Sequence, residues 1–216
     1  MSLPRVLLNP LRLPRKGPEI GRGRAVIVIP GLTTGDISTT LLRRTLKARG
    51  FVPEGWRQGI NLGADPEKMA RLQARVAQLH AETGQKVVLV GWSLGGLYAR
   101  VLANREAEHV DMVVTVASPI AGSRRGNSAW ALYEAINDHK VDDTPFDADL
   151  ACKPPVPTLS VWSAVDGIVA PECACGGESD SDHRLQIDAQ HFTIGTSRDC
   201  IEKIIGKMAE LDAERG

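Results

Sequence analysis

Residues Gly91-Trp92-Ser93-Leu94-Gly95 follow the apolar run 87–90 and precede a stretch whose composition suits a helix. A Gly-x-Ser-x-Gly pattern between a strand and a helix predicts a turn so tight that the serine hydroxyl projects from the edge of a sheet. Glycine is needed on both sides, because a side chain there would collide with neighbouring backbone. The free N–H groups at the start of the following helix bring partial positive charge to the same place. We therefore predict that Ser93 is a nucleophile.

The rest of the chain alternates short apolar runs with amphipathic stretches, a pattern typical of parallel strands joined by crossover helices. The expected strands are 25–29, 51–60, 86–90, 112–117, 158–162 and 184–187. The expected helices are 36–49, 65–84, 95–104, 128–137 and 199–211. Asp65 and Pro66 suit the start of the second helix, and Gly84 suits its end. On the first helix, the side chains expected to face the core are Ile37, Leu41, Leu42 and Leu46.

Size and charge favour one domain with no nucleic-acid partner. The chain has 216 residues, with 26 basic and 26 acidic residues that cancel. This length suits a single α/β domain, which we place at 25–216 after an N-terminal extended arm over 1–24. No basic stripe is interleaved with aromatic residues, so nothing points to a polyanion. The sequence carries no signal for an oligomeric state.

The N-terminal arm is basic, and Pro4, Pro10 and Pro14 interrupt its apolar residues. It therefore cannot form the continuous apolar helix of a secretory signal or a transmembrane span. We expect it to lie across the domain surface without stable membrane insertion; an arm that touches a membrane is the minority alternative. Without a secretory signal, we expect a cytoplasmic protein with reduced thiols.

Four cysteines are present, Cys152, Cys173, Cys175 and Cys200. An even number permits one or two disulfides, and the spacing does not select a pairing. Cys173 and Cys175, together with His183, raise the alternative of a zinc site. We disfavour it, because the spacing is tighter than the usual Cys-x-x-Cys and no second ligand pair accompanies it.

Between Pro119 and Pro157 the regular alternation breaks. The short helix expected over 128–137 carries Trp130 and Tyr133 along one side, and the segment ends in a proline-rich stretch. We interpret residues 119–157 as a small lid-like insertion above the carboxyl ends of the strands. The alternative is a surface excursion without a catalytic role.

A serine hydroxyl needs a base within hydrogen-bond reach and a third group that orients the base. In open α/β sheets such groups gather in the loops that follow strands. Of the five histidines, only His191 follows a strand. Asp166, directly after the strand expected at 158–162, is the predicted acid; its alternative is a plain turn residue, and Asp188 is the second choice.

The charge that develops during acyl transfer needs hydrogen-bond donors that are already aimed at it. One should be the backbone N–H of Leu94, the residue after the nucleophile. The other should come from the loop 30–35 after the first strand, where we select the N–H of Leu32. The Thr33 hydroxyl is an additional option, although a loop threonine more often bonds its own backbone.

With these motifs the chain resembles the α/β-hydrolase superfamily, specifically the small bacterial serine esterases and lipases. The resemblance covers about residues 25–210 and rests on a few segments, namely Ile29-Pro30-Gly31-Leu32, 91–96, Ala117-Ser118-Pro119, 166–169 and His191. The order Ser…Asp…His is also that of the superfamily. The resemblance implies an α/β-hydrolase fold and serine hydrolase activity. Many relatives have His-Gly where this chain has Pro30-Gly31.

We accordingly expect hydrolysis of a small-molecule carboxylic ester through an acyl-enzyme, with Ser93, His191 and Asp166 as catalytic triad and with no metal or cofactor. An apolar acyl slot could be lined by Leu32, Trp92, Trp130, Tyr133 and Ile168. The short insertion favours small, soluble esters. The same residues would also suit a thioesterase, an amidase or an acyltransferase. Further alternatives are a binding protein on an inactive hydrolase scaffold, and a thiol or metal sensor that uses Cys173, Cys175 and Cys200.

Overall fold

A parallel sheet forms the centre of the molecule. The computed structural model of the chain describes residues 17–123, 125, 127–150 and 152–215. Within them, six strands pair in the order β2-β1-β3-β4-β5-β6, and every neighbouring pair is parallel. The strands are β1 (Ala25–Ile29), β2 (Val52–Gly55), β3 (Val87–Trp92), β4 (Val110–Val116), β5 (Thr158–Trp162) and β6 (His183–Gln186). All six predicted strands are therefore present, with β2 shorter than expected.

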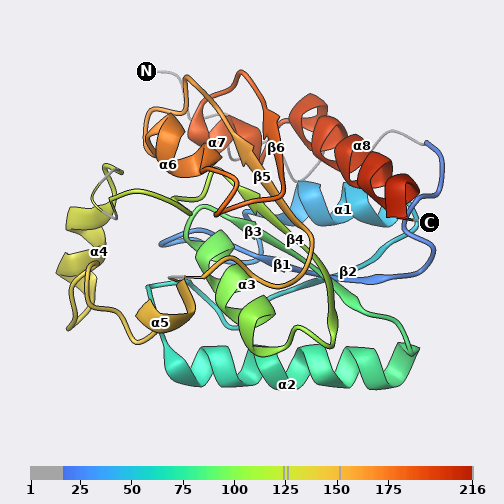
Figure 1. Cartoon of the computed structure of the whole chain (residues 1–216), viewed down its shortest axis with the longest axis horizontal. Coiled ribbons are helices and arrows are strands. Elements are labelled where there is room, and N and C mark those ends of the chain that lie inside the picture. Colours follow the sequence, from blue (N-terminus) through green and yellow to red (C-terminus); the bar gives the residue numbers. More distant parts are fainter. Residues whose placement is uncertain (1–16, 124, 126, 151, 216) are drawn as a thin grey trace.

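Helices cover both faces of the sheet, as predicted (Figure 1). On one face lie α1 (Thr40–Ala48) and α8 (Arg198–Arg215), and on the other lie α2 (Pro66–Thr83) and α3 (Leu94–Arg105). Because side chains alternate along a strand, Val26 and Val28 pack toward α1 and α8, whereas Ile27 and Ile29 pack toward α2 and α3. Burial of both sheet faces explains why the four inner strands, β1, β3, β4 and β5, are mostly apolar.

The ends of α2 follow the sequence signals. The Asp65 carboxylate accepts hydrogen bonds from the N–H groups of Glu67 and Lys68, at 2.9 and 3.0 Å. Gly84 ends the helix with a left-handed φ of 66°, a conformation that glycine adopts without steric cost. These caps confirm the predicted helix limits.

The start of α1 differs from the prediction. The helix begins at Thr40 rather than near residue 36, and Ile37 is 82% exposed, so its expected burial was wrong. The physical reason is that the Asp36 carboxylate accepts the N–H groups of Trp56 and Arg57, which ties this segment to the end of β2. Three other predicted core residues are buried, namely Leu41, Leu42 and Leu46.

The segment between β4 and β5 forms two short helices, α4 (Trp130–Ile136) and α5 (Asp147–Leu150), which lie together at one end of the molecule (Figure 1). Side-chain hydrogen bonds attach them to the body. The Tyr133 hydroxyl accepts from the N–H of Ala64 at 3.2 Å, and Asn137 Nδ2 donates to the Leu62 carbonyl at 2.8 Å. Two further short helices, α6 (Pro171–Cys175) and α7 (His191–Ile194), were not predicted.

Of the predicted arm, residues 1–16 lie outside the described residues, and the domain boundary stays a prediction. The last residue before β1, Arg24, forms ion pairs with Asp111 at 2.7 Å and with Asp212. No helix in the described part of the chain is both long and apolar enough to cross a bilayer.

Candidate active site

Ser93 occupies a strained turn between β3 and α3. Its backbone has φ 54° and ψ −123°, which is unusual for a residue with a side chain. The Ser93 N–H donates to the Val116 carbonyl at 2.7 Å and anchors the turn to β4. A Cβ on Gly91 would lie 2.2 Å from the Gly95 carbonyl oxygen, and one on Gly95 would lie 2.2 Å from the Ile29 carbonyl oxygen. Both glycines are therefore required by backbone contacts.

His191 and Asp166 form a buried pair. His191 Nδ1 lies 2.9 Å from each carboxylate oxygen of Asp166. The backbone N–H of His191 donates to the backbone carbonyl of Asp166 at 2.9 Å. Asp166 Oδ1 also accepts from the N–H groups of Ile168 and Val169, at 3.0 and 2.7 Å. The turn interpretation and the acid interpretation of Asp166 are thus compatible, because the turn itself fixes the carboxylate against the imidazole.

The charge state of this pair follows from its surroundings. Burial by itself would raise the pKa of Asp166, but hydrogen bonds with His191, Val169 and Ile168 outweigh burial and lower that pKa. An ionised carboxylate can only accept, so the proton in this contact lies on His191 Nδ1, and Nε2 is left as an acceptor. Asp188, the second-choice acid, is exposed and accepts instead from Gln186 Nε2 at 3.2 Å.

Ser93 and His191 line one open groove. This outer groove, as we call it, lies between the loop after β1, α4 and α7, and its walls include Thr33, Leu132 and Phe192. Trp92 also lines it, and its ring stacks on the His191 imidazole with a centroid distance of 6.2 Å. The structure thus brings Ser93 and His191 to one cavity, with Asp166 behind the histidine.

The two predicted oxyanion donors flank the nucleophile. The chain at Gly31 passes so near Ser93 that a Cβ on Gly31 would lie 3.2 Å from the Ser93 Cβ. Among the described residues, the N–H groups of Leu32 and Leu94 donate to no protein acceptor, so both are free for a ligand. The Thr33 hydroxyl donates to the carbonyl of the preceding residue, Leu32, at 2.7 Å and so bonds the local backbone, the more usual behaviour.

Asn61 holds the loop that carries Leu32, and our sequence reasoning missed it. This asparagine is fully buried, and its Nδ2 donates to the Pro30 carbonyl at 2.8 Å. Its backbone carbonyl accepts from the Thr33 N–H at 2.7 Å, and its N–H donates to the Thr34 carbonyl at 2.8 Å. Asn61 therefore forms hydrogen bonds with the loop both before and after Leu32. It follows β2, so the rule that located Asp166 and His191 would also have located it.

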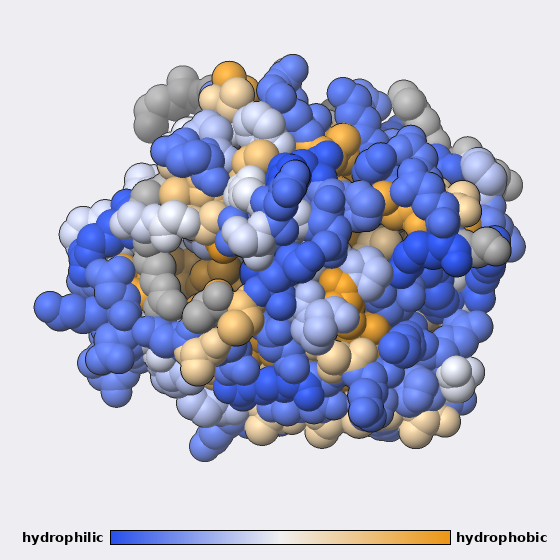
Figure 2. Space-filling view, viewed as in Figure 1, coloured by the Kyte–Doolittle hydropathy of each residue, from blue (hydrophilic) through white to orange (hydrophobic). Residues whose placement is uncertain are grey.

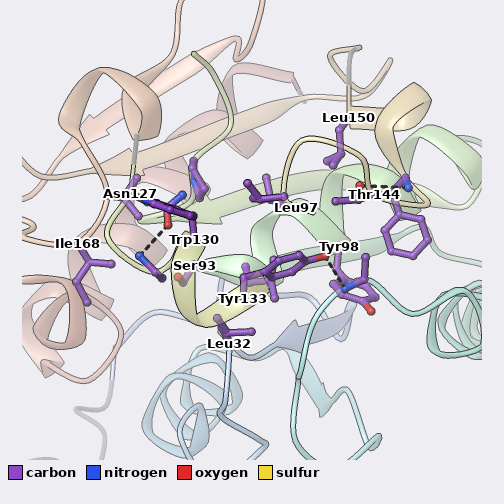
Figure 3. Close-up of a pocket in the computed structure, with 17 residues that line it drawn as sticks. Leu32, Ser93, Leu97, Tyr98, Asn127, Trp130, Tyr133, Thr144, Leu150 and Ile168 are labelled. Carbon is purple, nitrogen blue, oxygen red and sulfur yellow. Dashed lines mark hydrogen bonds between the residues drawn. The ribbon is translucent and has the colours of Figure 1, made fainter. Parts of the chain in front are cut away.

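A second cavity, which we call the inner pocket, extends from Ser93 between α3 and the insertion (Figure 3). Four residues predicted for an acyl slot or the oxyanion loop line it, namely Leu32, Trp130, Tyr133 and Ile168. Lining residues that were not predicted include Leu97, Tyr98, Phe146 and Leu150. Trp92 is placed in the outer groove instead. Figure 2 shows an apolar hollow left of centre, on the side where the insertion lies.

The cysteines form no disulfide. All four are free: Cys173 and Cys200 are buried, Cys175 is half-buried and Cys152 is exposed. Burial raises the pKa of the Cys173 thiol, as does the nearby Glu172 carboxylate. Within the described part of the chain, no three His, Cys, Asp or Glu side chains gather closely enough to hold a metal ion.

Comparisons with known protein families and solved structures both indicate the α/β-hydrolase fold. A family model of the alpha/beta hydrolase fold matches residues 53–151, whereas no curated protein sequence matches the chain significantly. Among solved structures, an esterase from Pyrococcus furiosus matches with a TM-score of 0.61 and 16% identity, over 89% of this chain and 83% of the esterase. The mature form of a Bacillus licheniformis lipase matches with a TM-score of 0.62 and 14% identity, over 91% and 95%. A methylesterase from Arabidopsis gives 0.62 and 14%, over 87% and 99%. At such identities the likeness shows the fold alone.

Proposed function

Because the chain has the α/β-hydrolase fold, we propose that it is a serine hydrolase that cleaves carboxylic esters through an acyl-enzyme intermediate. Ser93 is the nucleophile, His191 the base and Asp166 the residue that orients the base. The observation that carries the proposal is a serine on a strained turn that shares one groove with a histidine, whose far side is held by a buried carboxylate. The fold alone hosts many functions, so the proposal depends on this site.

In the first half-reaction, Ser93 Oγ attacks the ester carbonyl carbon while His191 Nε2 accepts the hydroxyl proton. The imidazolium that forms is stabilised by Asp166, which is ionised because its pKa is lowered. The C–O bond to the alcohol then breaks, and Nε2 returns the proton to the departing oxygen. The products of this half-reaction are the alcohol and an ester between Ser93 and the acyl group.

The N–H groups of Leu32 and Leu94 stabilise the negative oxygen of the tetrahedral intermediate. Their lack of protein acceptors supports this role, since preorganised donors are worth about 10²–10³-fold in rate each. In the second half-reaction, a water molecule loses a proton to His191 Nε2 and attacks the acyl-enzyme. Ser93 then departs with that proton, and the carboxylic acid is released.

The experiment that tests this proposal combines labelling with turnover. We expect a fluorophosphonate probe to modify the wild-type protein at Ser93, and p-nitrophenyl esters to be hydrolysed. The variant Ser93→Ala should retain its fold by circular dichroism but lose kcat by about 10⁴-fold or more. The variant Ser179→Ala, which changes an exposed serine outside the site, is the matched control and should behave as wild type.

Three outcomes would change the assignment. Absence of labelling and turnover in the folded wild-type protein would favour a binding protein on an inactive scaffold. Faster turnover of thioester or amide counterparts than of the matched ester would retain the triad and change the substrate class. Transfer of the acyl group to an added alcohol in preference to water would indicate an acyltransferase.

A further inference from the structure

Two cavities of different character meet at Ser93. The inner pocket includes Ser93 and Leu94 but not His191, whereas the outer groove includes Ser93 and His191 but not Leu94. The residues common to both are Leu32, Ser93, Ala129 and Ile168. A substrate whose carbonyl carbon lies at Ser93 Oγ would therefore extend one part into each cavity.

The inner pocket offers little to a polar or charged group. Among its described lining residues there is no Lys, Arg, His, Asp or Glu. The Tyr98 hydroxyl donates to the Gly63 carbonyl at 2.6 Å and accepts from the Asp65 N–H at 2.8 Å. The Tyr133 hydroxyl accepts from Ala64 N–H and lies 2.7 Å from His139 Nε2. Because these hydroxyls are occupied elsewhere, the tyrosines contribute aromatic surface, and the cavity suits an apolar group.

Two aromatic side chains in mutual contact, Tyr98 and Phe146, line the inner pocket away from Ser93. Phe146 is 4% exposed, and its ring meets that of Tyr98 edge to face with centroids 5.6 Å apart. Figure 3 shows Leu32, Trp130 and Ile168 around Ser93, with Leu97, Tyr98, Thr144 and Leu150 toward the opposite end. Since the hydroxyl bonds of Tyr98 fix its position, Phe146 and Tyr98 limit the length of whatever enters from Ser93.

Proton transfer decides which part of the ester occupies which cavity. The oxygen that leaves must receive a proton from His191, so the alcohol has to lie on the histidine side of Ser93. The acyl group stays bonded to Ser93 Oγ after the alcohol departs, so it extends into the cavity that the alcohol does not occupy. Of the two cavities, only the outer groove is lined by His191.

We propose that the inner pocket binds the acyl group and the outer groove binds the alcohol, so that the substrates are esters of apolar, uncharged carboxylic acids whose length is limited by Phe146. This assignment rests on the proposed function. It makes Phe146, on the insertion, and Phe192, on α7, determinants of the two different halves of the substrate. Phe192 is 52% exposed in the outer groove, where it meets the His191 ring edge to face at 5.5 Å.

The test uses two series of esters and two phenylalanine variants. The first series varies the acyl chain from acetate to decanoate with p-nitrophenol constant, and the second varies the alcohol with butyrate constant. We expect Phe146→Ala to raise the kcat/KM ratio of long over short acyl chains by about tenfold or more, with the alcohol profile unchanged. We expect Phe192→Ala to change the alcohol profile and leave the acyl profile unchanged.

Two more measurements keep the proposal testable if Phe146→Ala folds poorly. Leu97→Phe adds bulk partway along the inner pocket and should shift the acyl optimum to shorter chains. In the wild type, a half-ester of adipic acid should be hydrolysed more slowly than the matching hexanoate by about tenfold or more, since the pocket has no partner for the second carboxylate.

The outcomes separate the two proposals. If no ester is hydrolysed and Ser93 is not labelled, the proposed function itself is wrong. If esters are hydrolysed but Phe146→Ala changes the alcohol profile, or Phe192→Ala the acyl profile, the assignment of the cavities is wrong while the activity stands. Equal turnover of the adipate half-ester and hexanoate would overturn the apolar acyl class.

Discussion

The edge of the sheet that carries Ser93 and the insertion that lines the pocket beside it are held in place by different contacts. At the edge, the Ser93 turn depends on backbone contacts, with Gly91 and Gly95 against carbonyl oxygens at distances that admit no side chain. Among the described residues, the part of the insertion from 129 to 156 is attached to the rest of the domain by side-chain hydrogen bonds, such as those of Tyr133 and Asn137 to the loop after β2. Backbone contacts fix geometry rigidly, whereas individual side-chain bonds contribute only about 0.5–1.5 kcal/mol each. The chemistry should therefore tolerate little change, and the shape of the pocket should be tunable.

The same comparison separates rate from selectivity. Ser93 and Asp166 lie in turns after β3 and β5, and His191 begins the short helix α7 after β6, so their relative positions depend on the sheet. Phe146 and Leu150 reach the inner pocket from the insertion. Changes at the edge should lower kcat for every substrate, and changes in the insertion should alter which substrate is preferred.

The largest effect is expected at the acid. Asp166→Asn keeps an acceptor for the Ile168 and Val169 N–H groups but cannot stabilise the imidazolium or hold the same tautomer, so kcat should fall by about 10³–10⁴-fold. Steady-state kinetics with a thermal melt as the folding check measure this. Asp188→Asn, which changes the exposed second-choice acid, is the control. A larger loss at Asp188 than at Asp166 would reverse the assignment.

A smaller loss is expected from the backbone of the turn. Gly95→Ala places a Cβ against the carbonyl oxygens of Ile29 and Pro30, at 2.2 and 2.7 Å, so the free energy of unfolding should drop by about 1–3 kcal/mol. Gly206→Ala on α8 meets nothing within 4 Å and should instead add about 0.5–1 kcal/mol. Chemical denaturation measures both. Equal changes in unfolding free energy for the two variants would contradict the inference that backbone contacts at Gly95 exclude a side chain.

The loop that carries Leu32 should show an intermediate effect. Asn61→Ala removes the bond to the Pro30 carbonyl, and we expect kcat to fall about 10–100-fold, equivalent to about 1.4–2.7 kcal/mol, with KM little changed. Asn61→Asp retains the acceptor for Gly63 but not the donor and should lose a similar amount. A change confined to KM or to stability would argue that Asn61 does not position the oxyanion loop.

We expect a substitution in the insertion to lower kcat less than the substitutions at Asp166 and Asn61. Tyr133→Phe deletes the hydroxyl that accepts from Ala64 N–H and contacts His139, at an expected cost of about 1 kcal/mol in stability. Because the ring still lines the inner pocket, KM for long acyl chains should rise more than kcat falls. A loss of kcat as large as that of Asn61→Ala, for all esters, would place Tyr133 with the chemistry rather than with the pocket.

The pH dependence of the free energy of unfolding tests the contribution of the Asp166 carboxylate at the edge of the sheet. The lowered pKa of Asp166 means that its contribution to stability is present above the ordinary aspartate value of about 3.9 and is lost as the pH falls through the lowered value. In urea titrations, the wild type should therefore lose stability relative to Asp166→Asn as the pH is taken from 5 to 2. If the difference in unfolding free energy between the wild type and Asp166→Asn stays constant over that interval, the ionised carboxylate does not stabilise the folded state.

Much of this arrangement was predictable from local patterns. The strands β1, β3, β4 and β5 are apolar runs bounded by turn residues, and α2 carries its caps in Asp65 and Gly84. Ser93 was predicted from its Gly-x-Ser-x-Gly turn, and Asp166 and His191 were predicted because a parallel sheet collects the ends of its strands at one edge. Ile37 was misplaced because the carboxylate of Asp36 bonds to a distant strand end, which helix periodicity cannot reveal.

The sequence by itself determined the alternation of strands and helices and the tight turn at Ser93, since both depend on the shape of neighbouring residues and on where glycine is required. Only the tertiary structure decided that Asn61 holds the Pro30–Thr34 loop, that Phe146 packs against Tyr98 in the lining of the inner pocket, and that two cavities share Ser93. These features join segments tens of residues apart, and their geometry depends on how the insertion packs against α3 and the loop after β2. Local propensity carries no information about such contacts.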